Sequence, residues 1–305
     1  MSGGGEKRYN PGLGLIKFIA CFCVVWVHNA KAVPLMVLDV PVFVTVAFLF
    51  SSAGLLKRLW RILHPFWLWG VTAGVVHLLM GDSPSARDWF WQLTLGHVFC
   101  KPLYFLSLLA FYTVLFHPLR KVRDAVAIPL FLSVAAFSWV WQYMGFNWRM
   151  FGGVDPTWGY WCGRFFELLP CVCLGLVVQR GRIPPVVFGS ASLVVVAAWK
   201  MWGCRIPTGE HFGYAGVLPP MLSVCAVLLA RWIGETALGG RLARVRSVFD
   251  LSPRIYYVHA IVGYLLVALV GWQMGVVRAL TVFAVSAVLA LGIAVVTRRF
   301  GRGRV

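Results

Sequence analysis

Residues 276–296 form an almost unbroken apolar run, VVRALTVFAVSAVLALGIAVV, in which Arg278 is the one charged residue. The hydrocarbon core of a bilayer is crossed by a helix of roughly 20 predominantly apolar residues. A run of this length and composition therefore predicts a membrane-spanning helix.

The rest of the chain repeats this pattern. Nine further apolar runs lie at residues 13–30, 35–56, 62–80, 98–116, 125–144, 160–178, 185–202, 214–232 and 248–270. Hydrophobic residues make up 60% of the chain and charged residues only 12%, whereas soluble domains carry about a quarter charged residues. These observations exclude a soluble enzyme. We expect an all-α, polytopic protein of the cell membrane, with about ten transmembrane helices in one bundle at residues 13–297.

The basic residues indicate how this bundle is oriented. Loops on one side carry 18 Lys and Arg residues, and loops on the other side carry 8. Lys and Arg collect in cytoplasmic loops, so the N-terminal segment 1–12 and the basic tail 298–305 are both expected in the cytoplasm. The net charge of +18 would suggest nucleic acid as the partner of a soluble protein. Here topology and the attraction of anionic lipid account for it, so the expected partner is membrane lipid and not nucleic acid.

One competing interpretation concerns the N-terminus. Lys7 and Arg8, the apolar run after them and the sequence AKA at 30–32 together imitate a secretory signal with its cleavage site. However, Lys17 lies inside the supposed apolar region, and cleavage would leave nine spans with mismatched loop charges. We therefore favour a retained first transmembrane helix.

Two ionisable residues lie in the first predicted span, and each is costly inside a membrane. Lys17 and His28 are 11 residues apart, so on a helix they share a face and lie roughly 16 Å apart along the axis. Lys17 would lie toward the cytoplasm and His28 near the outer end. The alternative is structural: a lysine that reaches the interface and a histidine that hydrogen-bonds a neighbouring helix.

A basic cluster precedes the third predicted span. Arg58 and Arg61 are three residues apart, on one helical face. Two neighbouring guanidinium groups suit a polyphosphate, which accepts bidentate hydrogen bonds. The plain alternative is that basic residues at a cytoplasmic helix end mark topology.

Two further charged sites lie within predicted spans. Arg164 and Glu167 are three residues apart near the outer end of the sixth span, where they would form either an ion pair or part of a binding site. His259 falls midway through the ninth span, and its catalytic and structural roles cannot be separated from sequence. The eight cysteines include no CxxC motif, so no metal site is expected.

Five segments, taken in order, carry a resemblance that covers nearly the whole chain. They are Lys17 with His28, residues 41–43 leading to 52–56, Arg58 and Arg61 leading to 64–66, residues 102–106 with Tyr112, and residues 255–259. In this order they resemble the acyltransferase-3 family of membrane proteins. Two positions depart from its pattern: Lys17 stands where arginine is more usual, and Ala53 separates the serine and glycine of the second segment.

The resemblance implies an enzyme that moves an acyl group, usually acetyl, from cytoplasmic acyl-CoA to a hydroxyl of an extracytoplasmic glycan or lipid-linked sugar. His28 would act as general base on that hydroxyl, or as an acyl carrier. Arg58 and Arg61 would hold the CoA phosphates, and Lys17 would lie along the path of the thioester arm.

Other residues would orient His28 or bind the acceptor. The candidates for these roles are Asp39, Asp155, Arg164, Glu167, Glu210 and His259. The alternative class is a secondary transporter of a sugar or lipid-linked intermediate, because transporters also place histidines and arginines inside helical bundles. A non-catalytic membrane scaffold is the third interpretation, and nothing in the sequence indicates an oligomeric state.

Overall fold

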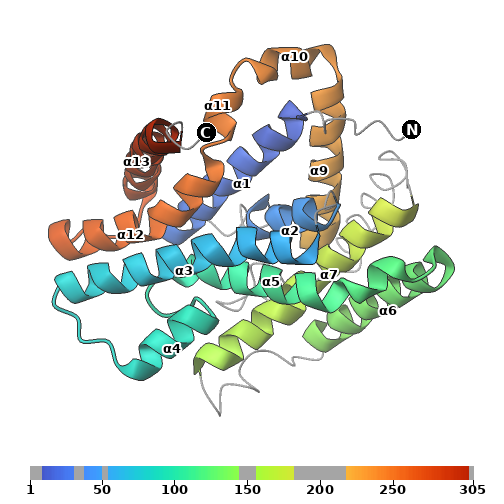
Figure 1. Ribbon diagram of the computed structural model, residues 1–305, viewed down its shortest axis with the longest axis horizontal. Coiled ribbons are helices and arrows are strands. Elements are labelled where there is room, and N and C mark those ends of the chain that lie inside the picture. Colours follow the sequence, from blue (N-terminus) through green and yellow to red (C-terminus); the bar gives the residue numbers. More distant parts are fainter. Residues whose placement is uncertain (1–8, 31–37, 50–53, 144–155, 182–217, 302–305) are drawn as a thin grey trace.

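The computed structural model describes residues 9–30, 38–49, 54–143, 156–181 and 218–301, and every regular element in these ranges is a helix (Figure 1). The long helices are α1 (Pro11–Ala30), α3 (Leu55–Leu79), α5 (Tyr104–Phe116), α6 (Asp124–Tyr143), α7 (Pro156–Gly181), α9 (Leu218–Glu235), α12 (Ser252–Val270) and α13 (Val276–Gly301). The short ones are α2 (Val40–Leu49), α4 (Ala86–Thr94), α10 (Ala237–Ala243), α11 (Arg246–Phe249) and the 3-10 turns η2 (Lys101–Leu103) and η3 (Pro118–Lys121).

Seven helical stretches in these ranges are long and apolar enough to cross a membrane, and there are eight if α9 and α10, bent by 90°, form one broken span. The chain is therefore a multi-pass membrane protein, and the predicted all-α class is confirmed. The predicted span at 185–202 lies outside the described residues. So do residues 35–37 and 50–53 of the predicted span at 35–56, whose described part contains the ten-residue helix α2 and the start of α3. Ten spans therefore stay a prediction.

Three predicted features differ from the structure. The third predicted span begins at residue 62, but α3 begins at Leu55, inside the predicted span at 35–56. The sequence predicts that the ninth span begins at residue 248, but α11 ends at Phe249 and α12 begins at Ser252. Pro253 lies in the first turn of α12, where proline is favoured because its missing N–H has no helical partner there. In addition, the loop before residue 98 contains helix α4, whose first turn is closed by reciprocal hydrogen bonds between Ser85 and Asp88.

The bundle has two distinct ends. At one end, which we call the basic end, Asn10 before α1 donates to the carbonyl of Arg231 in α9, and Arg180 at the end of α7 pairs with Asp124 at the start of α6. Helices α10 and α11, with Arg241, Arg244 and Arg246, also lie there. The opposite end, which we call the cavity end, gathers the last turns of α1 and α3 and the first turns of α5, α7 and α13.

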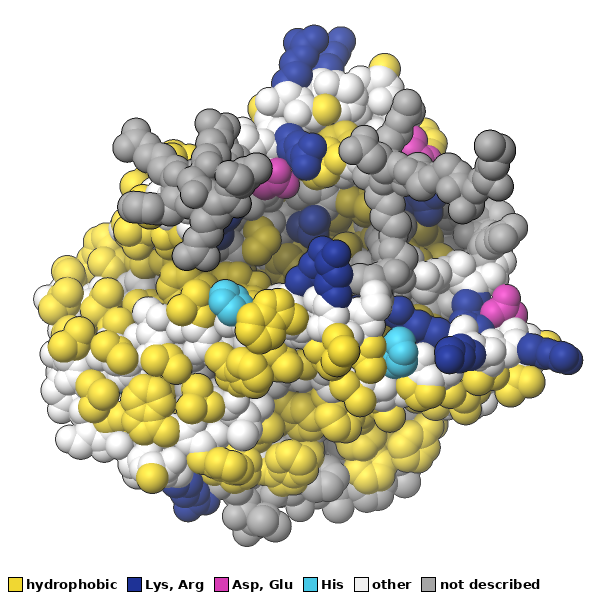
Figure 2. Space-filling model, viewed as in Figure 1, with side chains coloured by type: hydrophobic (Ala, Val, Ile, Leu, Met, Phe, Trp, Pro, Cys, Tyr) yellow, Lys and Arg dark blue, Asp and Glu magenta, His cyan; other side chains and the backbone are white. Residues whose placement is uncertain are grey.

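The core lies where α1, α2, α5, α7 and α12 meet. Val24, Phe48, Leu108, Leu168 and Ile255, one from each of these helices, are almost fully buried. By contrast, α3, α6 and α13 turn large apolar side chains outward, which suits contact with lipid. Figure 2 shows such side chains spread over much of the visible face of the bundle.

Helices α1 and α9 cross at close range near the basic end. A Cβ atom added at Gly12 would lie 1.7 Å from the carbonyl oxygen of Ala230, and one added at Gly234 would lie 2.8 Å from the backbone nitrogen of Gly12. Small residues permit such close backbone approach between membrane helices. This crossing, together with packing against α12 and α13, sets the position of α1 and hence of His28.

Candidate functional site

A cavity of about 390 Å³ opens at the cavity end of the bundle. Its polar lining consists of His28, Asn29, His77, Lys101, His259, Tyr264 and Arg278. These residues come from the last turns of α1 and α3, the segment before α5, the middle of α12 and the first turn of α13. Five segments thus supply one lining in which three of the polar residues are histidines.

His28 and His259 face each other across this cavity, with their ring centroids 5.8 Å apart. Nδ1 of His259 lies 2.6 Å from the carbonyl oxygen of Tyr256. Because a carbonyl can only accept, Nδ1 carries the proton and Nε2 of the neutral ring keeps its lone pair. The side chain is 1% exposed, and Nε2 has no hydrogen-bond partner among the described residues. His28, in contrast, is exposed toward the cavity that it lines.

The last turn of α1 is held in place by α13. The side-chain oxygen of Asn29 accepts a hydrogen bond from Nε of Arg278 at 3.0 Å, and its amide donates to the carbonyl of Val25 at 2.8 Å. The carbonyl of Asn29 also accepts from the backbone N–H of Gly275. These hydrogen bonds fix the residue beside His28, so the backbone position of the imidazole is well defined.

Three of the five segments singled out in the sequence meet near this cavity: His28, residues 102–106 and residues 255–259. The hydroxyl of Tyr256 donates to the carbonyl of Pro102 at 2.5 Å, which ties α12 to η2. His259, one helical turn later, and His28 then line the same space as Pro102. Residues that sequence alone showed only as separate short motifs are therefore neighbours.

The third histidine in the lining, His77, is paired with a carboxylate. Its Nδ1 lies 2.6 Å from Oδ2 of Asp82, and the hydroxyl of Tyr264 donates to the same oxygen at 2.8 Å. The rings of His77 and Tyr264 stack with centroids 3.9 Å apart. The hydrogen bond from His77, and then that from Tyr264, holds the pKa of Asp82 below its ordinary value. The carboxylate therefore stays ionised at the rim.

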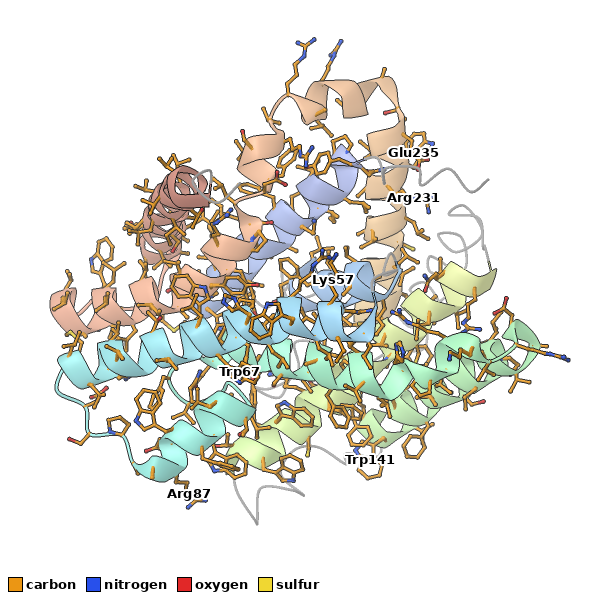
Figure 3. The ribbon with its side chains drawn as sticks, in the orientation of Figure 1. Lys57, Trp67, Arg87, Trp141, Arg231 and Glu235 are labelled. Atoms are coloured by element: carbon orange, nitrogen blue, oxygen red, sulfur yellow. The ribbon has the colours of Figure 1, made fainter. Side chains whose placement is uncertain are left out.

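Lys101 is placed in the lining by a buried glutamine on α4. Oε1 of Gln92 accepts hydrogen bonds from the backbone N–H groups of Val98 and Phe99 at 3.0 and 2.8 Å. Gly96, with a φ of +72°, adopts the left-handed backbone conformation that turns the chain between α4 and Val98. Figure 3 shows Trp67 of α3 pointing toward α4, where its indole N–H donates to the carbonyl of Leu93.

Beside the lining, Arg164 forms an ion pair with Glu167 at 2.5 Å, which is the first of the two arrangements expected from their spacing. Its guanidinium lies over the ring of Tyr160, on which His97 stacks. Burial, followed by the charges of Lys101 and Arg164, lowers the pKa of His97 to about 4. His97 is therefore neutral at pH 7, in a region where the electrostatic potential is positive.

The remaining candidates lie elsewhere. Asp39 is buried and accepts a hydrogen bond from the backbone N–H of Val40 at the start of α2. Lys17 is half-buried in α1 near the basic end, within electrostatic range of Asp250. Neither lines the cavity. Asp155 and Glu210 lie outside the described residues.

The two arginines of the basic cluster have different surroundings. Arg58 is buried; its Nη2 donates to the carbonyl of Ala47, its guanidinium lies over the ring of Phe48, and Nη1 has no partner among the described residues. Arg61 is exposed. The charge near Arg58 comes from Arg120 of η3, which is close enough to repel it electrostatically. A like-charged neighbour and an unsatisfied buried donor are features of an anion site.

Sequence reasoning missed five polar residues of the lining: Asn29, His77, Lys101, Tyr264 and Arg278. Arg278 carried a usable signal, because an ionisable residue inside an apolar run suggests a functional role. The pair of His77 and Asp82 straddles the end of a helix and has no such signal. Among the described residues, no three His, Cys, Asp or Glu side chains are arranged to hold a metal ion.

Comparisons of the chain with protein-family models, with curated proteins and with solved structures find no match. The class of this protein is therefore defined by its fold and its cavity alone. The chain is a multi-pass membrane protein whose helices enclose, at one end, a polar cavity lined by histidines and cations.

Proposed function

We propose that this protein is a membrane acyltransferase. It would move an acyl group, acetyl in the first instance, from cytoplasmic acyl-CoA to a hydroxyl of an extracytoplasmic glycan or lipid-linked sugar. The observation that supports this most is the histidine pair in the cavity, where His259 keeps an unpartnered Nε2 and His28 reaches open space. An acceptor hydroxyl needs a base of this kind, and the resemblance of five ordered segments points the same way.

The reaction can be written around His28. The acceptor hydroxyl gives its proton to the His28 imidazole while its oxygen bonds to the thioester carbonyl carbon. The carbon–sulfur bond then breaks, and the CoA thiolate leaves and takes up a proton. Nε2 of His259 accepts a hydrogen bond from the acceptor, which would hold its reacting hydroxyl against His28. Histidine suits this task because its ordinary pKa lies near working pH.

The donor would bind at the basic end. Arg58 brings an unsatisfied buried guanidinium nitrogen and Arg120 a neighbouring charge. Phosphate oxygens would accept from that nitrogen and offset both charges. Figure 2 shows a hollow on this part of the molecule in which Lys and Arg side chains gather, and Figure 3 shows Lys57 of α3 pointing into the same region. The thioester arm would then run along α1, past Lys17, toward His28.

This mechanism requires the basic end to face the cytoplasm and the cavity end to face outward, with ten spans in all. On a cysteine-depleted background, a cysteine at exposed position Arg87 should react with a membrane-impermeant maleimide added outside. A cysteine at exposed position Arg244 should react only after the membrane is opened. Outside labelling at Arg244 would contradict the orientation and, with it, the sidedness of the reaction.

The function itself is tested with purified protein in lipid nanodiscs and radiolabelled acetyl-CoA. We expect CoA release to depend on the protein and acetyl label to appear on a glycan fraction from the host membrane. A transporter would bind or exchange a sugar without breaking the thioester. Absence of both CoA release and acetyl-CoA binding would refute the acyltransferase proposal.

A further inference from the structure

Two basic side chains, Lys101 and Arg278, line the cavity, and neither forms an ion pair with a carboxylate among the described residues. Within the described part of the chain, Arg278 donates only to neutral oxygens: Oδ1 of Asn29 and the carbonyls of Trp272 and Gly263. The Lys101 side chain is exposed at the cavity. Both charges are therefore available to a ligand, and Arg278 is held rigidly.

The helix termini strengthen this positive field. Lys101 is the first residue of η2, which continues directly into α5, and Arg278 lies in the first turn of α13. Neither α5 nor α13 has an acidic residue in its first turn. The N-terminus of a helix carries a partial positive charge and favours anions, so a cation there is unfavourable on its own. A bound anion would offset two cations and two helix dipoles together.

The carboxylates near the cavity form no ion pair with Lys101 or Arg278 among the described residues. Asp82 is occupied by hydrogen bonds from His77 and Tyr264, and Glu167 is paired with Arg164. The last turns of α1 and α3 also reach the cavity, yet carbonyls in both already accept backbone hydrogen bonds, such as the one from Gly275 to Asn29. Burial lowers the pKa of His97, and the charges of Lys101 and Arg164 lower it further, which agrees with a positive potential here.

We infer that this cavity binds a glycan or lipid-linked sugar that carries an oxyanion, either a carboxylate or a phosphate. Lys101 and Arg278 would hold the charge, and the unpartnered Nε2 of His259 would accept a hydrogen bond from a neighbouring hydroxyl. That this anionic ligand is the acyl acceptor rests on the proposed function, whereas its binding does not. The chemical class of the ligand, an oxyanion with a neighbouring hydroxyl, follows from the geometry, because the cavity offers cations and a hydrogen-bond acceptor within one space.

Binding is measured without acyl-CoA, by saturation-transfer NMR on the protein in nanodiscs of neutral lipid. One arm compares glucuronate with glucose, which tests a sugar carboxylate. The other compares a short prenyl diphosphate with the matching prenol, which tests the phosphate of a lipid carrier. We expect at least one anion to bind about ten- to a hundred-fold more tightly than its neutral partner, as charge-assisted hydrogen bonds allow.

The variant Lys101→Gln removes a charge from an exposed side chain, so the fold should survive. It should abolish most of the preference for the anion and leave binding of the neutral partner unchanged. The matched control is Arg87→Gln, which removes an exposed cation of α4 that does not line the cavity and should keep the full preference. Equal binding of anion and neutral partner in both arms, or an unchanged preference in Lys101→Gln, would overturn the inference.

The same measurements separate this inference from the proposed function. Selective anion binding that depends on Lys101, without CoA release or acetyl-CoA binding, would leave the anion site standing and refute the enzyme. Acetyl transfer to neutral and charged acceptors at equal rates would support the enzyme and overturn the anion site.

Discussion

Replacing His28 with alanine is expected to slow acyl transfer by about 10²–10⁴-fold, the usual effect of removing a general base. An alcohol is a weak nucleophile at neutral pH and must lose its proton as it attacks the thioester. His28 lines the cavity and lies beside His259, so its loss removes the proton acceptor from the centre of the site. The rate of label transfer from acetyl-CoA to the glycan acceptor measures this effect.

Two other histidines provide controls. His64, exposed on α3, and His117, at the end of α5, lie outside the cavity lining, so their alanine variants should retain most of the activity. Acyl-CoA binding should also survive in His28→Ala, because the donor phosphates are proposed to bind at the opposite end of the bundle. Wild-type transfer by His28→Ala, together with loss of transfer in His259→Ala, would assign the base to His259 instead.

Replacing Arg58 with alanine is expected to weaken acyl-CoA binding by about ten- to a hundred-fold for each charge-assisted hydrogen bond removed, roughly 1.5–3 kcal/mol. The physical reason is the unsatisfied Nη1 of Arg58, buried beside the like charge of Arg120. Phosphate oxygens would satisfy this donor and reduce the repulsion. Equilibrium binding of acetyl-CoA to the purified protein measures the change.

Two variants keep this prediction testable, because Arg58 also touches Ala47 and Phe48 and its replacement can disturb packing. Arg58→Lys retains the charge but not the planar fork, and it should bind acyl-CoA with intermediate affinity. Arg61→Ala removes an exposed arginine one turn away and should change affinity little. Equal losses of acyl-CoA affinity in Arg58→Ala and Arg61→Ala would support phosphate binding by both adjacent guanidinium groups, as the sequence predicts. Unchanged affinity in both variants would mean that the two arginines only mark the cytoplasmic side of the membrane.

Composition and periodicity predicted the class of this protein well. The run at residues 276–296 corresponds to α13, and the run at residues 13–30 corresponds to α1, each within a few residues. Such runs can be recognised in the sequence because each helix contacts lipid along most of its length. Each span is therefore specified by its own residues. Breaks such as the one before Ser252, and short elements such as α4, depend on single prolines and caps and were missed.

Sequence alone determined that His28 and His259 are costly inside a membrane and deserve a function, but not that they are neighbours. Their proximity depends on how α1 packs against α12. Likewise, only the tertiary structure added Arg120 as a charge near Arg58, and only it gathered Lys101, Arg278 and His77 around one cavity. The physical reason is that membrane insertion acts on each helix by itself, whereas a binding site is made by side chains from several helices. Close approaches such as that between Gly12 and Gly234 decide how those helices meet, and local sequence patterns do not record them.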